Sequence, residues 1–296
     1  MAQNPSFSSA QPPLRRGRSW LRVFLIGLLL FVITTIVMFL TLNPNLYPTV
    51  ILIGNFLVPI TFVAFLYDHR HFSALTPTTI GVSFCVGGVL GVIGASIFET
   101  LLVPVPTSPG QGLSLGSGLL VGLIEEGCKI IAVIILARRM PHTSEMDGLL
   151  LGGAVGMGFA ALESTGYAFT AFLTSGGHVS VSIVETVFRG LFAPFGHGVW
   201  TAILGAVLFR ASGPRRFRIT GAVIVAYLFV SVLHGLWDGF PFSIYFVIPP
   251  GIPISVTSLA LGIIGIIGLF FLYRSSLVQQ RQLLAATPTL TSSPSV

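Results

Sequence analysis

A long apolar run, LRVFLIGLLLFVITTIVMFLTL, occupies residues 21–42, and Arg22 is its only charged residue. At about 1.5 Å of rise per residue, about 20 helical residues cross the ~30 Å hydrocarbon core of a bilayer. Similar stretches recur along the 296-residue chain, which has a mean hydropathy of +0.92 and only 8% charged residues. In an ordinary globular domain, about 25% of the residues are charged. The sequence therefore predicts an all-α fold, a polytopic membrane helix bundle of about eight transmembrane helices.

The first run is too long for the apolar core of a signal peptide, and no small-residue cleavage site follows it, so we expect it to be retained. Residues 1–19 and 275–296 are polar segments with Ser, Pro and Thr, and are expected to be disordered cytoplasmic tails. Residues 20–274 then form one transmembrane domain. The predicted spans are residues 21–42, 49–67, 79–103, 112–137, 147–173, 179–209, 219–240 and 254–273.

Basic residues occur on alternate sides of these spans. Arginines precede the first span and follow the second, fourth, sixth and eighth. The loops without Lys or Arg are residues 43–48, 104–111, 174–178 and 241–253. Because cytoplasmic loops carry the excess of Lys and Arg, this alternation predicts that both termini are cytoplasmic. The net charge of +6 reflects this bias. Since no basic stripe interleaved with aromatic residues is present, no nucleic-acid partner is expected, and the surrounding partner is the lipid bilayer.

Ionisable residues also lie inside four consecutive spans. A charge in the middle of a membrane helix costs about 2.5–3.5 kcal/mol on insertion scales, so these groups must face one another or water. Such a cluster is a candidate functional site. Glu99 and Glu185 fall toward the outer ends of their spans and are not assigned to it. The cluster comprises Glu125, Glu126, Lys129, Glu163, His197, His234 and Asp238.

Helical spacing predicts several pairings within the cluster. Lys129 follows Glu125 by four residues and Glu126 by three, so its ammonium group can pair with both carboxylates. His234 and Asp238 are also four residues apart, and a carboxylate at that spacing can fix the tautomer of an imidazole. A structural ion-pair network or a helix-end tether would use the same residues.

The remaining polar residues are less specific taken one at a time. Glu163 shares a helix face with Tyr167, to which it could hydrogen-bond in a purely structural role. A lone histidine such as His197 is more often a core residue than a ligand. Glu185 and Arg189, four residues apart, are predicted to form a separate structural ion pair.

In this order, these motifs resemble the PrsW family of intramembrane proteases. The pattern of that family is EExxK, FxxxE, a helix bearing His, and HxxxD, and it covers about residues 112–240, the core of the expected protease domain. The related CAAX prenyl protease and bacteriocin-processing group has FxxxH and HxxxN instead, so the resemblance favours PrsW. The matching residues are Glu125, Glu126, Lys129, Phe159, Glu163, His197, His234 and Asp238.

The resemblance implies an intramembrane endopeptidase in the cytoplasmic membrane of a prokaryote. Its substrates would be membrane proteins, for example single-span proteins such as anti-sigma factors, cleaved toward the extracytoplasmic side. The oligomeric state and the cleavage position are left open. The alternative is a membrane transporter or scaffold that uses the same buried charges as a proton relay or as an ion-pair network.

Peptide hydrolysis needs a water molecule, a base that activates it, and donors for the oxyanion. We assign Glu125 as the general base and His234 as the donor to the oxyanion, oriented by Asp238. His197 would complete the water site, and Lys129 would keep the glutamate pair charged.

Two versions of the water activation remain open. In the first, the three glutamates and two histidines of the cluster hold a divalent metal such as Zn²⁺, with Glu126, Glu163, His197 and His234 named as its ligands. Tyr167 is assigned a supporting role in the site. In the second, glutamate and histidine activate water without a metal, as the related prenyl protease group suggests. Oxygen-rich ligands do not select zinc clearly, so the residues alone do not decide.

Overall fold

The computed structural model describes residues 17–70, 73, 75–104, 112–142, 144–240, 244–248 and 252–286. Helices α1 (Ser19–Thr41) and α2 (Tyr47–Asp68) are joined through a short 3₁₀ turn, Pro44–Leu46. A third long helix is continuous from α3 (Pro77–Val82) through a π-helical turn (Ser83–Gly87) to α4 (Gly88–Leu102). The helices that follow are α5 (Leu115–Ala137), α6 (Glu145–Thr174), α7 (Val179–Ala211), α8 (Gly221–Gly239) and α9 (Val256–Ala286).

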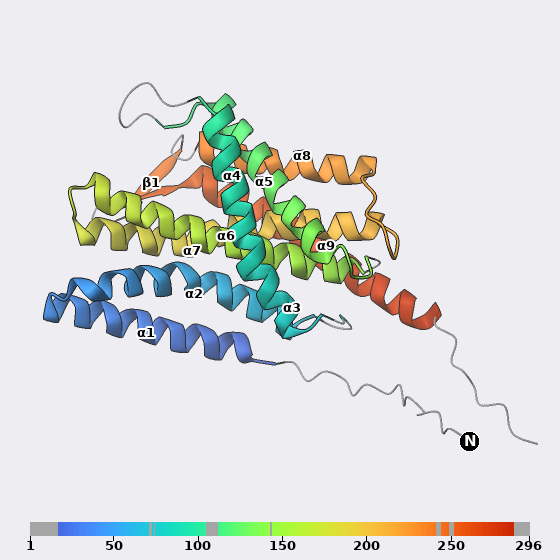
Figure 1. The fold of residues 1–296 in the computed structure, drawn as a ribbon, viewed down its shortest axis with the longest axis horizontal. Helices are drawn as coiled ribbons and strands as arrows, with labels where there is room; N and C mark the ends of the chain where they lie inside the picture. The colour runs from blue at the N-terminus through green and yellow to red at the C-terminus, as the bar shows by residue number, and fades with distance from the viewer. Residues whose placement is uncertain are drawn as a thin grey trace, which may run out of the picture.

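This architecture confirms the predicted all-α bundle of about eight membrane helices. Seven of the described helices are long and apolar enough to cross a membrane. The eighth, α5, has 23 residues and carries three charged side chains near its middle. In Figure 1, α6 and α7 run side by side through the molecule, α1 and α2 form a second pair beside them, and α4 and α5 cross the bundle steeply.

Glycine allows α6 and α7 to pack backbone against backbone. A Cβ atom at Gly148, Gly152 or Gly156 would collide with a carbonyl oxygen of α7, at Gly205, Thr201 and His197 respectively. These small residues at four-residue intervals therefore serve close helix packing, as is common in membranes. The two helices are connected by a tight turn in which Gly176 and Gly177 have φ of +74° and +89°, a conformation that favours glycine.

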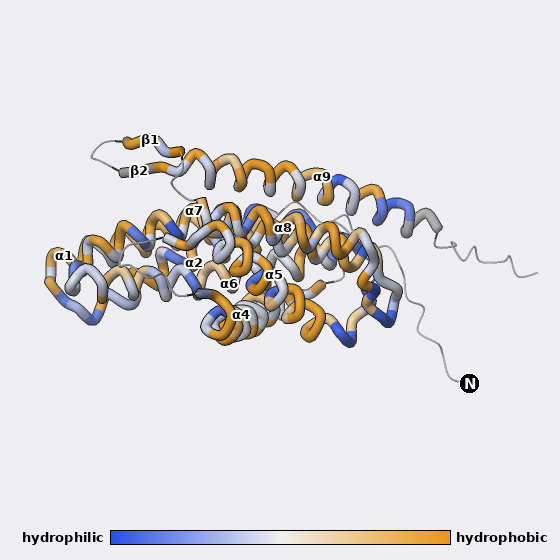
Figure 2. Tube along the Cα trace, turned by 90° about the horizontal axis from the view of Figure 1, so that it is seen from above, coloured by the Kyte–Doolittle hydropathy of each residue, from blue (hydrophilic) through white to orange (hydrophobic). Residues whose placement is uncertain are grey.

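Two segments differ from the sequence prediction. Residues 241–253 were expected to be a loop, but β1 (Tyr245–Ile248) pairs antiparallel with β2 (Ile252–Ser255). In Figure 2, this hairpin and α9 lie together over one face of the other helices. The predicted disordered tail from residue 275 is wrong as far as Ala286, because α9 continues to that residue.

Tertiary contacts explain the longer α9. The side-chain amide of Gln280 donates to Ser144 Oγ at 2.6 Å, and the backbone N–H of Glu145 donates to Gln279 Oε1 at 2.9 Å. These bonds attach the last turns of α9 to the start of α6, which composition alone could not reveal. Residues 287–296, and residues 1–16 of the predicted N-terminal tail, lie outside the described part of the chain.

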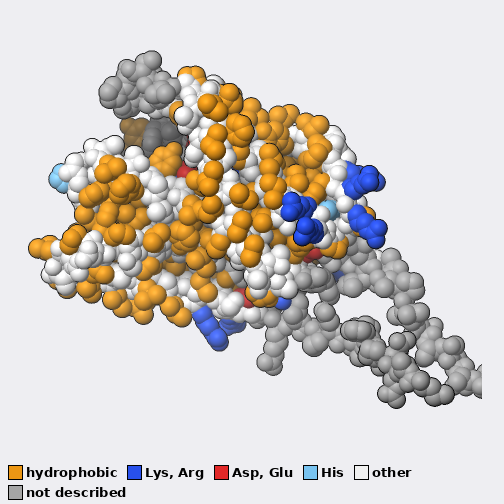
Figure 3. Space-filling model, viewed as in Figure 1, with side chains coloured by type: hydrophobic (Ala, Val, Ile, Leu, Met, Phe, Trp, Pro, Cys, Tyr) orange, Lys and Arg blue, Asp and Glu red, His pale blue; other side chains and the backbone are white. Residues whose placement is uncertain are grey.

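The surface is that of a membrane protein. Figure 3 shows apolar side chains over most of the visible face, while the visible Lys and Arg side chains gather toward one end and one edge of it. This distribution agrees with the alternation of basic loops. The cytoplasmic location of both termini remains a prediction.

Candidate active site

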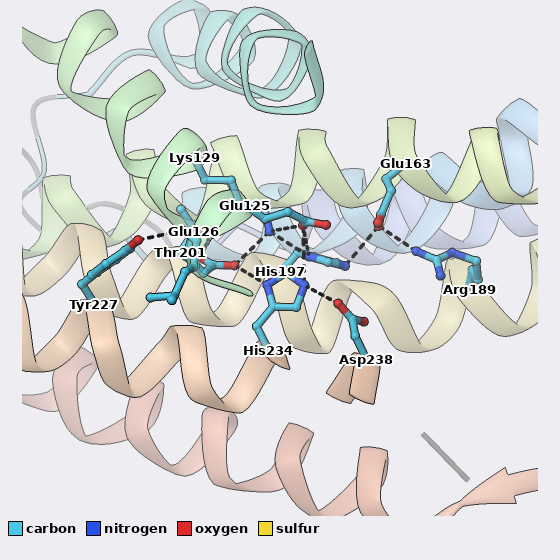
Figure 4. Close-up of polar contacts among 11 residues, drawn as sticks. Glu125, Glu126, Lys129, Glu163, Arg189, His197, Thr201, Tyr227, His234 and Asp238 are labelled. Atoms are coloured by element: carbon cyan, nitrogen blue, oxygen red, sulfur yellow. Dashed lines mark hydrogen bonds and ion pairs between the residues drawn. The ribbon is translucent and has the colours of Figure 1, made fainter. Parts of the chain in front are cut away.

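The middle of α5 carries the first charged motif. The ammonium nitrogen Nζ of Lys129 donates hydrogen bonds to Glu125 Oε2 at 3.0 Å and to Glu126 Oε1 at 2.9 Å. It also lies 2.9 Å from Nδ1 of His197, on α7. The Lys129 side chain is fully buried, and its Nζ lies 4.0 Å from the centre of the Phe159 ring. The predicted pairing of Lys129 with both glutamates is thus present, and α6 and α7 complete its surroundings (Figure 4).

Glu126 fixes the orientation of His234, on α8. Its Oε1 accepts a hydrogen bond from His234 Nδ1 at 3.0 Å, and its Oε2 accepts one from Thr201 Oγ1 at 3.1 Å. Both carboxylate oxygens are therefore engaged. Because the two nitrogens of an imidazole point in different directions, Nε2 of His234 faces away from Glu126.

Glu163 fixes His197 in the same manner. Oε2 of Glu163, on α6, lies 3.2 Å from His197 Nε2 and 2.6 Å from Nη2 of Arg189. With Nε2 directed at Glu163, Nδ1 of His197 faces the centre of the cluster, next to Lys129. A carboxylate that binds one ring nitrogen sets both the tautomer and the direction of the other nitrogen.

The two remaining histidine nitrogens converge on Glu125. Glu125 Oε2 lies 3.6 Å from His197 Nδ1 and 3.5 Å from His234 Nε2. His234 Nε2 is buried and makes no hydrogen bond to a described residue, with Asp238 Oδ2 3.4 Å away. The ligand atoms of Glu125, His197 and His234 lie within 4.8 Å of one another and could hold a metal ion. One carboxylate and two histidines form a known donor set of catalytic zinc sites, so these residues fit a divalent metal.

Comparison with known proteins agrees with this geometry. Residues 76–272, about two thirds of the chain, match the family described as "PrsW family intramembrane metalloprotease". The chain belongs to the PrsW family. No curated protein and no solved structure gives a significant match.

As a PrsW-family protein, the chain is a peptide hydrolase and an integral, multi-pass membrane protein. The predicted family and enzyme class are therefore confirmed. Its substrates are membrane proteins in a lipid bilayer, which the family implies. Membership of a metalloprotease family also agrees with the group of one glutamate and two histidines.

The geometry favours a different ligand set from the predicted one. The prediction named Glu126 and Glu163 together with His197 and His234. Each of these glutamates instead lies at the ring nitrogen that points away from the common centre, at Nδ1 of His234 and at Nε2 of His197. Glu125 lies next to the other two nitrogens. The positions of Glu126 and Glu163 are therefore those of carboxylates that orient the two histidines.

The surroundings of Glu163 also differ from the prediction. The predicted ion pair between Glu185 and Arg189 is wrong, because the guanidinium group of Arg189 binds Glu163 on the neighbouring helix. Tyr167 is 49% exposed and makes no hydrogen bond with Glu163. Its ring lies against the guanidinium carbon of Arg189, with 3.8 Å between that carbon and the ring centre.

One residue near the cluster was not predicted to take part. The carboxyl group of Glu99, on α4, has an oxygen, Oε1, that is buried and makes no hydrogen bond to a described residue. The sequence did contain a signal for this, because the buried residues Gly87, Gly91 and Ala95 precede Glu99 at four-residue intervals. A stripe of small residues that leads to an acid places that acid on the packed face of the helix. This stripe of α4 packs against the site of this PrsW-family protein, because a Cβ atom at Gly91 would lie 3.0 Å from the Phe159 ring and 3.6 Å from Cγ of Lys129.

Proposed function

We propose that the protein is an intramembrane endopeptidase that cleaves single-span membrane proteins, such as anti-sigma factors, in the middle to outer part of the membrane. The observation that carries this proposal is the convergence of Glu125 Oε2, His197 Nδ1 and His234 Nε2 within a buried cluster. Family membership favours a protease over the transporter or scaffold that the buried charges alone would allow.

Each residue of the cluster takes a defined role in this proposal. Glu125, His197 and His234 hold a divalent cation such as Zn²⁺, which supplies Lewis acidity at this position when bound. Glu126 and Glu163 orient the two histidines. Residues that hold the ligands in this way are as important to such a site as the ligands themselves.

Substrate reaches the cluster from the side of Glu163 and Asp238. The side chains of these two residues are 17% and 25% exposed, whereas those of Glu126 and His234 are fully buried. Asp238 is the partly exposed carboxylate next to His234, so we assign it to accept or donate the proton of the attacking water or of the leaving amine. Lys129 keeps Glu125 and Glu126 charged and in place.

The test is cleavage of a co-expressed, reporter-tagged single-span anti-sigma factor. Glu125→Gln should abolish cleavage while the protein remains folded in the membrane. Glu185→Gln is the matched control, because it makes the same change in a membrane helix outside the cluster, and it should leave cleavage unchanged. Cleavage by the Glu125→Gln variant at the wild-type rate would exclude the proposed site.

A second measurement addresses the metal. Purified protein should lose activity on treatment with a chelator and regain it when Zn²⁺ or another divalent ion is added back, in proportion to the metal bound. Full activity of metal-free protein would instead assign the activation of water to Glu125 and the histidines alone.

A further inference from the structure

We propose that Arg189 is a positioning residue of this active site, which holds Glu163 and through it fixes the orientation of His197. The inference rests on the proposed function and deepens it, because it concerns the same cluster. The motifs of the family that were found in the sequence do not include Arg189. Sequence spacing assigned this residue to a structural pair with Glu185 instead.

A single carboxylate oxygen connects Arg189 to the histidine. Glu163 Oε2 lies 2.6 Å from Nη2 of Arg189 and 3.2 Å from Nε2 of His197. Arg189 and His197 lie on α7 and Glu163 lies on α6, so the connection spans the closely packed helix pair (Figure 4). Movement of the guanidinium group would therefore move the carboxylate that sets the direction of the imidazole.

The guanidinium group of Arg189 is itself held in place by Tyr167. The Tyr167 ring lies against it, with 3.8 Å between the guanidinium carbon and the ring centre, which is a stabilising cation–π geometry. Tyr167 and Glu163 are four residues apart on α6 and so present the ring and the carboxylate on one helix face. The contact with Arg189 thus explains why a tyrosine lies at the exposed position 167. No sequence motif suggested this role.

The carboxylate of Glu163 lies at the accessible edge of the cluster and needs a positively charged partner there. Side-chain exposure is 22% for Arg189 and 17% for Glu163, compared with 4% for His197. A carboxylate at membrane depth without a positive partner is costly, and its side chain would turn toward another cation. The other cation among the described residues of the cluster is Lys129, which already serves Glu125 and Glu126. Arg189 therefore keeps Glu163 on His197 Nε2 and away from Lys129.

The variants Arg189→Gln and Arg189→Lys test this inference in the cleavage assay. We expect Arg189→Gln to lower kcat about 10–100-fold, as is typical when a residue that orients a ligand is lost, and Arg189→Lys to recover part of the rate. Because Arg189 acts through Glu163, the double variant Arg189→Gln/Glu163→Gln should be no slower than Glu163→Gln alone. The matched control is Arg210→Gln, which breaks the ion pair between Arg210, at the end of α7, and Glu145, at the start of α6, at 3.7 Å and outside the cluster.

A second readout does not depend on proteolysis. In protein labelled with ¹⁵N-histidine and reconstituted in lipid nanodiscs, the ¹⁵N shifts report which nitrogen of His197 carries the proton, and a His197→Gln variant assigns the signals. We expect wild-type protein to carry it on Nε2, and Arg189→Gln to give a mixture of tautomers.

The two proposals fail in different ways. A protein that cleaves nothing, but whose His197 tautomer changes in Arg189→Gln, contradicts the proposed function and supports the role of Arg189. A protein that cleaves and is inactivated by Glu125→Gln, but keeps its rate and its His197 tautomer in Arg189→Gln, overturns the role of Arg189. Multiplicative losses in the double variant would also overturn it, because they would mean that Arg189 acts independently of Glu163.

Discussion

Replacement of Lys129 by methionine tests the electrostatics of the cluster directly. Nζ of Lys129 donates to Glu125 Oε2 at 3.0 Å and to Glu126 Oε1 at 2.9 Å, and the side chain is fully buried. Methionine keeps much of the apolar volume but removes the charge. Glu126 keeps its hydrogen bonds from Thr201 and His234, whereas Glu125 loses the one ammonium donor that the described residues provide to it.

The expected cost follows from the burial of the pair. Removing one partner of a buried ion pair costs about 3–5 kcal/mol. At about 2–4 °C per kcal/mol for a domain of about 150–250 residues, the Tm of Lys129→Met should fall by roughly 6–20 °C. The double variant Lys129→Met/Glu125→Gln should recover part of this loss, because it also removes the carboxylate that was left without a donor.

Thermal unfolding in detergent micelles measures these effects. The control is Arg139→Met, the same loss of one positive charge at an exposed position after the end of α5. Zn²⁺ should raise the Tm of Lys129→Met more than that of the wild type, because the ammonium group no longer competes for Glu125 Oε2 and His197 Nδ1. A Tm of Lys129→Met within about 2 °C of the control would refute a charged, buried Lys129.

Two further substitutions probe the packing and the hydrogen bonds around the site by the same Tm measurement. Gly158→Ala should destabilise by about 1–3 kcal/mol, because its Cβ would collide with the Phe84 carbonyl. Gly166→Ala on the same helix meets nothing within 4 Å and should be neutral to slightly stabilising, because alanine favours a helix interior more than glycine does. Equal Tm values for these two would contradict the close approach of α6 to the π-helical turn. Thr201→Val should cost about 1.5–3 kcal/mol, since Glu126 loses a hydrogen bond to a charged acceptor, and Thr201→Ser should retain it. No difference between the valine and serine variants would remove that bond from the site.

Within single helices, the sequence predicted much of this protein. The apolar run at residues 21–42 predicts a membrane helix, because its length and composition suffice to cross a bilayer. The three- and four-residue spacings predict the contacts of Lys129 with both glutamates and of His234 with Asp238, because the geometry of one helix sets them. Such contacts depend only on the positions of residues along one helix.

Contacts between helices required the tertiary structure. Spacing predicted that Arg189 pairs with Glu185, but the close approach of α6 brings Glu163 to it instead. The same packing decided that Glu125, and not Glu163, lies next to Nδ1 of His197.

The extension of α9 to Ala286 was likewise decided by its contact with α6, because Gln280 finds a partner there that its own segment does not provide. The physical reason is common to these cases. The rotation and the shift of one helix against another are set by the small residues that let their backbones meet, and a difference of one residue in that register changes every partner across the interface.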